Sequence, residues 1–271
     1  MSGLEALAKP LATLAFCWRL ERRDGVTIGL TSHDRDMTIG HVRYRAAPGM
    51  TPSAIRSGIT AEGGDTDLEG ALVADAINES DLMAGRWDGA ALELRLTEWD
   101  APGDLWLLLA QGEIGSVARR GGAFTAELVG AMAALKAPVA PSTSPDCRAA
   151  LGDRQCRVDM AARRRVVAVE GVEDVVVGVS GLAAGAYSFG TLRWMTGANG
   201  GMVQAVVDND GDTVTLADPP AFAVEPGALA LLTEGCDRQL TTCRTRFANV
   251  VNFRGEPYLP GTDLLTRYPG A

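Results

Sequence analysis

The sequence has few of the residues on which most enzymes and nucleic-acid-binding proteins depend. Lysine is almost absent from the 271 residues, and His33 and His41 are the only histidines. No nucleophile elbow or metal-protease motif accompanies them, so the sequence gives little support to a hydrolase. The formal net charge of −9 argues against a nucleic-acid surface, because neutralising phosphates requires a basic patch. We therefore expect a protein that is not an enzyme and that binds other proteins.

Long apolar runs are missing as well. No segment approaches the ~20 apolar residues that span a bilayer. Residues 1–10 lack the basic, apolar and small-residue pattern of a secretory leader. We expect the protein to be made in the bacterial cytoplasm, where cysteines are more often thiols or metal ligands than disulfides.

The length favours two domains, and the pattern favours β-structure in both. The Pro- and Ser-rich stretch 137–145 is the best linker, which predicts an N-terminal domain over 1–137 and a C-terminal domain over 138–271. Evenly spaced short strands and turn signals predict a mainly β protein. The first half should contain hairpin turns at 24–25 and 39–41 and a strand over 53–59, among others. The second half should contain a short helical turn within 146–156 and then six short strands between 166 and 232. We expect an N-terminal β-barrel or sandwich with one short helix over 78–85. In the C-terminal domain we expect a small β-barrel over 163–233, flanked by a short helical, cysteine-bearing subdomain (145–160 and 234–261) whose longest helix spans about 237–250.

Three conspicuous features have a plain structural interpretation. His33 and Asp34 could form a pair for acid–base chemistry. We expect instead a loop in which the aspartates of 33–36 accept backbone hydrogen bonds. The acidic stretch 208–212 lacks the glutamate of a calcium-binding loop and predicts a hairpin tip. Cys17 lies in a predicted strand beside aromatic residues and is expected to be a small buried apolar side chain.

The other four cysteines form two pairs that flank the predicted barrel. Eight residues separate Cys147 from Cys156, and six separate Cys236 from Cys243. A structural zinc binds sulfur at ~2.3 Å and uses closely spaced cysteines, whereas seven residues along a helix rise about 10 Å. A four-iron cluster is wider, and each of its cysteines binds a different iron. From spacing alone, a cluster, a zinc ion, four free thiols and two disulfides all stay open.

Two sets of residues carry a resemblance to a known family. They are 235–238, 243–249 and 252–261 near the C-terminus, and 31–36, 44–46, 51–55, 112–115 and 124–128 in the N-terminal half. This pattern resembles a phage tail family that includes gene transfer agent baseplate hub proteins and is similar to the tail-tip L proteins of long, non-contractile-tailed phages. The resemblance covers nearly the whole chain.

The resemblance implies a virion structural protein at the end of a tail tube. It implies a hub that joins a distal, tube-end ring protein to a central tail-tip protein and assembles as a homotrimer. It also implies a [4Fe-4S] cluster on Cys147, Cys156, Cys236 and Cys243, with zinc or no cofactor as the alternatives; Cys17 is not in that set. We expect Cys236 just before a helix and Cys243 within it, both facing the loop that carries the first pair.

Two other functions stay open at this point. A cluster could serve a redox enzyme or accessory protein, although no flavin or nicotinamide fingerprint accompanies the cysteines. Carbohydrate or host-surface binding would require exposed aromatic clusters that a sequence does not reveal.

Overall fold

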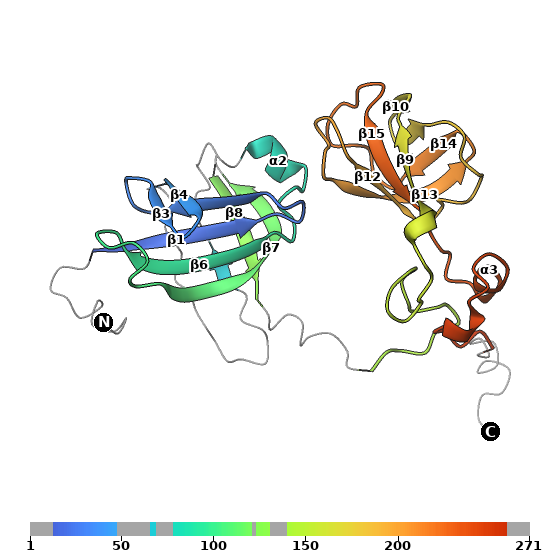
Figure 1. Ribbon diagram of the computed structural model, residues 1–271, viewed down its shortest axis with the longest axis horizontal. Coiled ribbons are helices and arrows are strands. Elements are labelled where there is room, and N and C mark those ends of the chain that lie inside the picture. The colour runs from blue at the N-terminus through green and yellow to red at the C-terminus, as the bar shows by residue number, and fades with distance from the viewer. Residues whose placement is uncertain (1–12, 48–65, 69–77, 121–122, 131–139, 259–271) are drawn as a thin grey trace. The chain divides into compact units, whose positions relative to one another are not determined.

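The computed structural model describes residues 13–47, 66–68, 78–120, 123–130 and 140–258 (Figure 1). The chain divides into two compact units, Met1–Val139 and Ala140–Ala271. Each unit is built on one curled β-sheet, so the predicted mainly β fold is confirmed. Among the described residues, no helix is both long and apolar enough to cross a membrane.

The first unit contains an eight-stranded sheet in the order β3-β4-β2-β1-β6-β7-β8-β5. Its elements are β1 (Leu14–Glu21), β2 (Thr27–Thr31), β3 (Met37–Ile39), β4 (Val42–Ala46), β5 (Thr66–Leu68), α2 (Glu79–Met83), β6 (Ala91–Glu98), β7 (Leu107–Arg120) and β8 (Ala123–Val129). β2 and β4 pair in parallel, and the other neighbouring strands of this sheet pair antiparallel. The predicted hairpin turns are confirmed at Gly25 and Gly40, whose φ angles of 92° and 61° suit glycine. The strand predicted over 53–59 lies outside the described residues.

Strand β1 lies in the middle of this sheet and is buried on both faces. Trp18 and Leu20 belong to the main core, where they pack with Trp87 and Leu94. Cys17 points to the opposite face, into a smaller apolar cluster of Ala15, Met37 and Tyr44. Because successive strand residues alternate between faces, an apolar residue at nearly every β1 position matches a strand covered on both sides.

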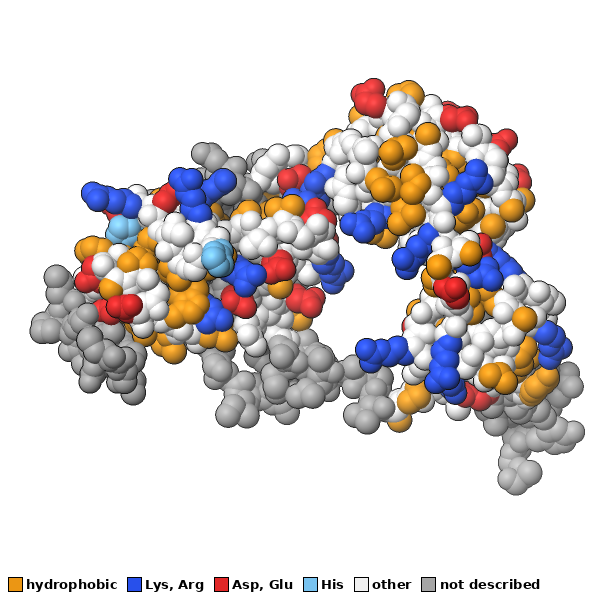
Figure 2. Space-filling view, in the orientation of Figure 1, with side chains coloured by type: hydrophobic (Ala, Val, Ile, Leu, Met, Phe, Trp, Pro, Cys, Tyr) orange, Lys and Arg blue, Asp and Glu red, His pale blue; other side chains and the backbone are white. Residues whose placement is uncertain are grey.

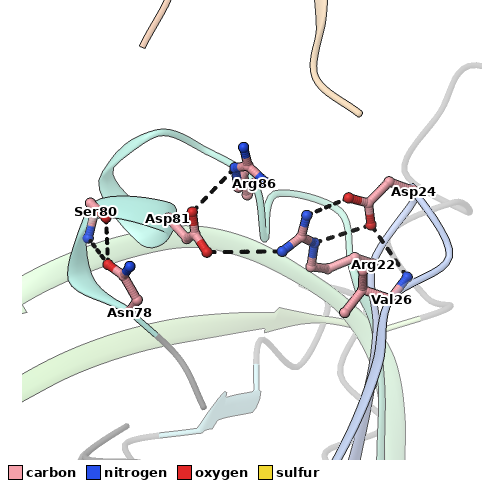
Figure 3. Close-up of polar contacts among 7 residues, drawn as sticks. All are labelled: Arg22, Asp24, Val26, Asn78, Ser80, Asp81 and Arg86. Atoms are coloured by element: carbon pink, nitrogen blue, oxygen red, sulfur yellow. Dashed lines mark hydrogen bonds and ion pairs between the residues drawn. The ribbon is translucent and has the colours of Figure 1, made fainter. Parts of the chain in front are cut away.

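A buried ionic network fixes the β1–β2 turn to α2 (Figure 3). The guanidinium of Arg22 pairs with Asp24 in the turn and lies 4.0 Å from the Asp81 carboxylate in α2. It also lies 5.4 Å from the centre of the Trp87 ring. Asn78 caps the helix by accepting the Ser80 N–H at 2.7 Å. The predicted short helix is therefore confirmed. Its packing depends on the guanidinium of Arg22, a contact that local sequence patterns do not reveal.

The second unit contains a seven-stranded antiparallel sheet in the order β10-β11-β14-β13-β12-β15-β9. The strands are β9 (Arg164–Ala168), β10 (Gly171–Glu173), β11 (Val176–Gly178), β12 (Thr191–Trp194), β13 (Val203–Asp210), β14 (Thr213–Leu216) and β15 (Leu229–Thr233). Leu192, Trp194, Val214 and Leu232 are fully buried at its centre. Six of these strands overlap the predicted ones, and β10 was missed because its three residues contain too little alternation to predict a strand.

The long helix predicted over 237–250 is wrong. Helix α3 comprises only Leu240–Thr245, followed by a 3-10 turn at Val250–Asn252. Arg238 has a φ of 62° and Ala248 one of 49°, and a right-handed helix accommodates neither. The segment from Cys147 to Cys156, for which a short helical turn is predicted, forms hydrogen-bonded turns and bends and contains no helix.

Candidate metal centre

Cys147 lies in an irregular loop that distant backbone holds in place. Its N–H donates to the carbonyl oxygen of Arg238 at 2.9 Å. Its sulfur accepts the N–H of Arg254 at 3.3 Å. The first cysteine is therefore fixed by the same two C-terminal segments that surround the second pair.

An ion pair next to Cys147 closes the loop onto the C-terminal segment. Arg148 donates to the two carboxylate oxygens of Glu256 at 2.6 and 2.7 Å, a bidentate geometry. Glu256 also accepts the Ser144 N–H at 2.9 Å, and its own N–H returns a bond to the Ser144 carbonyl at 2.8 Å. These bonds, with Arg148 first, lower the pKa of Glu256 to about 2. Gly255 permits the approach, because a Cβ there would lie 2.5 Å from the Asp146 carbonyl oxygen.

Cys156 ends a tight turn that a carboxylate organises. One oxygen of Asp153 accepts the N–H groups of Gln155 and Cys156 at 2.8 and 2.6 Å, and these contacts help to hold the Asp153 pKa below its ordinary value. From the other end of the unit, the side-chain amide of Asn249 donates to the Cys156 carbonyl at 2.6 Å. The same nitrogen lies 3.6 Å from the Cys156 sulfur. The turn is thus fixed both within itself and by the segment after α3.

The second pair of cysteines brackets the start of α3. Cys236 precedes the helix, and its sulfur accepts the Arg238 N–H at 3.3 Å. Asp237 accepts the Gln239 N–H at 2.9 Å and the Thr242 hydroxyl at 2.6 Å, which fixes the first turn. Cys243 is buried within the helix. The predicted placement, with one cysteine before the helix and one inside it, is confirmed.

All four cysteines line one small cavity. Its volume is about 20 Å³, and its walls include the apolar side chains of Leu151, Val158, Phe247 and Phe253. Each of the four cysteines is a free thiol, so the disulfide alternative does not match this structure. Within the described ranges, no three His, Cys, Asp or Glu side chains lie close enough together to hold one metal ion. The sulfurs line one cavity, but in this arrangement they do not form a site for a single ion.

A metal bound to these cysteines would have to replace the protons of their thiols. Burial raises the pKa of Cys236 and of Cys243, and the neighbouring cysteines raise both further, so these two thiols are protonated at neutral pH. Binding metal would release those protons. Two backbone N–H groups and the Asn249 amide already point at three of the sulfurs. Such donors stabilise sulfur that carries negative charge and tune a cluster's potential. The chemistry of the donors therefore suits an iron–sulfur cluster, while the cavity of about 20 Å³ between them has room for little more than a water molecule.

Arg246 connects this centre to the β-sheet of the same unit. It donates to the Glu234 carboxylate at 2.7 Å and to the carbonyl oxygens of Gly185, Ala186 and Gly235. Arg163 binds the same Glu234 oxygen at 2.7 Å. Both guanidinium groups lie within 5 Å of the centre of the Phe247 ring, at 4.8 and 4.9 Å. Arg246 thereby connects the segment around Cys243 to Glu234, which directly follows β15 and precedes Cys236.

The remaining candidates are structural. Cys17 is buried and its pKa is raised to about 11 by burial, as expected of an apolar side chain. His33 pairs with the exposed Asp34 at 3.2 Å, while Asp36 accepts the Ala46 N–H at 2.9 Å. The loop interpretation of 33–36 is therefore confirmed for Asp36, whereas Asp34 bonds to the histidine. The stretch 208–212 is the tip of the β13–β14 hairpin, as predicted.

Sequence reasoning missed the residues that support the cysteines. Asn249, Arg246 and Glu256 lie inside the C-terminal motif, but no role followed from spacing because their partners lie far away along the chain. A usable signal was present: polar residues are densely placed around the second cysteine pair in a segment that forms little regular structure.

Comparison with known proteins agrees with this architecture. Residues 3–159 match the family described as "Baseplate hub protein, N-terminal attachment domain", and residues 185–263 match the family "Phage conserved hypothetical protein BR0599". A solved chain from "Virion of native gene transfer agent (GTA) particle" is 34% identical, with a TM-score of 0.86. The alignment covers 99% of this chain and 95% of that one. No curated protein matches.

Proposed function

Because the chain belongs to the family of baseplate hub proteins, we propose that it joins the end of a tail tube to a central tip protein, with a [4Fe-4S] cluster on Cys147, Cys156, Cys236 and Cys243 stabilising its second unit. The chain is a structural protein of the baseplate of a phage-like particle. We propose further that it assembles as a homotrimer and catalyses no reaction.

One observation carries the cluster proposal. Four thiols line the same cavity, two from the segment that precedes the β-sheet in the sequence and two from the segment that follows it. When bound, a cluster cross-links the two segments through metal–sulfur bonds. The unfolded chain has no preformed ligand set, so such binding adds directly to folding free energy. This role requires no substrate access, which agrees with the small, closed cavity.

Anaerobic purification tests the cluster. We expect a brown protein with broad visible absorption and about four irons per chain, the content of this cluster type. Replacing Cys147 or Cys243 by Ser should remove the colour, whereas Cys17→Ser, in the other unit, should keep it. A colourless chain that contains zinc would refute the cluster.

Purified particles test the hub role. Quantitative mass spectrometry should find this chain in a copy number divisible by three. Chemical cross-linking should connect it both to the tube-end protein and to the tip protein. Absence of the chain from intact particles would contradict the role.

A further inference from the structure

The outward side of the sheet in the second unit carries a row of apolar side chains. Val203, Arg193, Leu231 and Val166 are successive cross-strand partners on β13, β12, β15 and β9, and partners project from the same face of a sheet. We call the exposed apolar residues here the outer apolar face; they are Val166, Phe189, Met195, Val203, Val207 and Leu229. Contiguous exposed apolar surface of this kind marks interaction sites in proteins that are monomeric on their own.

Two arginines accompany this face without a carboxylate partner. Arg193 lies in the row itself, and Arg164 lies in the next row, opposite Thr233. In the part of the chain that the structure describes, neither side chain forms an ion pair or a hydrogen bond. The neighbouring carboxylate of Glu234 is already taken by Arg163 and Arg246. A chain with a net charge of −9 thus presents unpaired positive charge at this place.

Phe189 adds a strained aromatic side chain to the same face. Its φ is 63° and 64% of its surface is exposed, an unfavourable conformation for a bulky residue that gains nothing from burial. The backbone around it is held by a close crossing, since a Cβ on Gly235 would lie 2.1 Å from the Phe189 carbonyl carbon. A groove of about 670 Å³ begins beside Phe189 and Val207 and runs to Cys236. Strain that persists in an exposed aromatic residue points to a function.

We propose that the outer apolar face is a docking surface for a different protein of the particle, one whose contact surface carries apolar side chains flanked by carboxylates. The particle setting rests on the proposed hub role. Hydrophobic side chains gather on the visible face of the second unit with Lys or Arg side chains beside them (Figure 2). The planar guanidinium groups of Arg164 and Arg193 suit carboxylates, which they bind in a bidentate geometry. A second copy that docked symmetrically would bring these like-charged arginines together. In a threefold ring a second copy would dock through another of its surfaces, and the cross-linking experiment tests that outcome.

Site-specific photo-cross-linking tests the identity of the partner. A benzophenone amino acid replaces Val203 in cells that produce particles, and the matched control places it at Val176, which is exposed on β11 and separated from β13 by β14. We expect position 203 to cross-link to an acidic segment of another tail polypeptide and position 176 to give no such product. Cross-links from position 203 to a second copy of this chain, or to no protein, would overturn the proposal.

Charge and polarity variants test the energetics. Val203→Glu and Arg193→Glu should each lower the amount of this chain per particle by about tenfold or more, because the first buries an unpaired carboxylate and the second reverses a desolvated charge contact. Val176→Glu should leave incorporation unchanged. The isolated variants must keep the melting temperature of the wild type, so that a loss reports docking and not folding. If wild-type chain is itself absent from particles, the hub role fails together with this inference. If it is present and all variants incorporate equally, only the docking inference fails.

Discussion

The side-chain amide of Asn249 donates to the carbonyl oxygen of Cys156 at 2.6 Å, although 93 residues separate them. The same nitrogen lies 3.6 Å from the Cys156 sulfur, and Asn252 donates to the Asn249 side-chain oxygen at 2.7 Å. This contact joins the last segment of the second unit to its first one at a cysteine. It makes Asn249 the side chain outside the four cysteines that most directly couples the proposed cluster to the fold.

Removing the Asn249 amide should therefore weaken both the fold and the proposed cluster. Asn249→Ala should cost about 1 kcal/mol in the free energy of unfolding, because it leaves a half-buried carbonyl without its donor. Asn249→Asp keeps the size but not the donor and should behave in the same way. Urea unfolding gives the first quantity, and the rate at which visible absorption fades in air gives the second. If visible absorption is lost at the same rate in the wild type and in both variants, Asn249 does not stabilise the cluster.

The pair Arg148–Glu256 predicts a specific loss of stability in acid. The pKa of Glu256 in the folded chain is about 2, below its ordinary value of 4.5. A lowered carboxyl pKa stabilises the fold fully above about pH 4.5, and this contribution is lost as the pH falls towards 2. Glu256→Gln should therefore melt at a lower temperature than the wild type at pH 7, and the difference should shrink to nothing near pH 2. A difference that does not change with pH would show that the carboxylate charge is not responsible.

The backbone of Gly235 lies so close to the backbone of Phe189 and Gly190 that position 235 should tolerate no side chain. A Cβ at Gly235 would lie 2.1 Å from the Phe189 carbonyl carbon and 2.2 Å from the Gly190 nitrogen, both in rigid backbone. Gly235→Ala should cost about 3 kcal/mol, at the upper end for overpacking. Gly171→Ala is the matched control, since nothing lies within 4 Å of a Cβ there. Its free energy of unfolding should stay within about 0.5 kcal/mol of the wild type.

Arg246 should be sensitive even to a conservative change. Its guanidinium binds Glu234 and several carbonyl oxygens at once, which a lysine ammonium group cannot reproduce. Arg246→Lys should cost about 1–3 kcal/mol, as expected for lost charge-assisted bonds. Arg244→Lys, on the exposed side of α3, should be neutral. If the two variants are equally stable, the contacts of Arg246 contribute nothing measurable.

Local sequence signals predicted the β-strands better than they predicted the candidate metal centre. Alternation in β6 and turn glycines such as Gly25 and Gly40 act within a few residues, so they are readable from sequence. The length of α3 was not readable, because Arg238 and Ala248 have left-handed backbone, and the Arg238 carbonyl oxygen is held by the N–H of Cys147, which is distant in sequence. The cysteine set followed from a family resemblance, since spacing alone left four alternatives open. Residues such as Asn249 act across the whole unit, and no local pattern encodes such a partner.

Native mass spectrometry of the intact chain, prepared without oxygen, tests the central claim most directly. The account predicts one species heavier than the polypeptide by four irons and four sulfides, the composition of a [4Fe-4S] cluster. That mass should be lost on replacing Cys147, Cys156, Cys236 or Cys243 by Ser and kept in Cys17→Ser. A bare chain, a chain with one zinc ion, or a cluster that survives loss of two of these cysteines would contradict it.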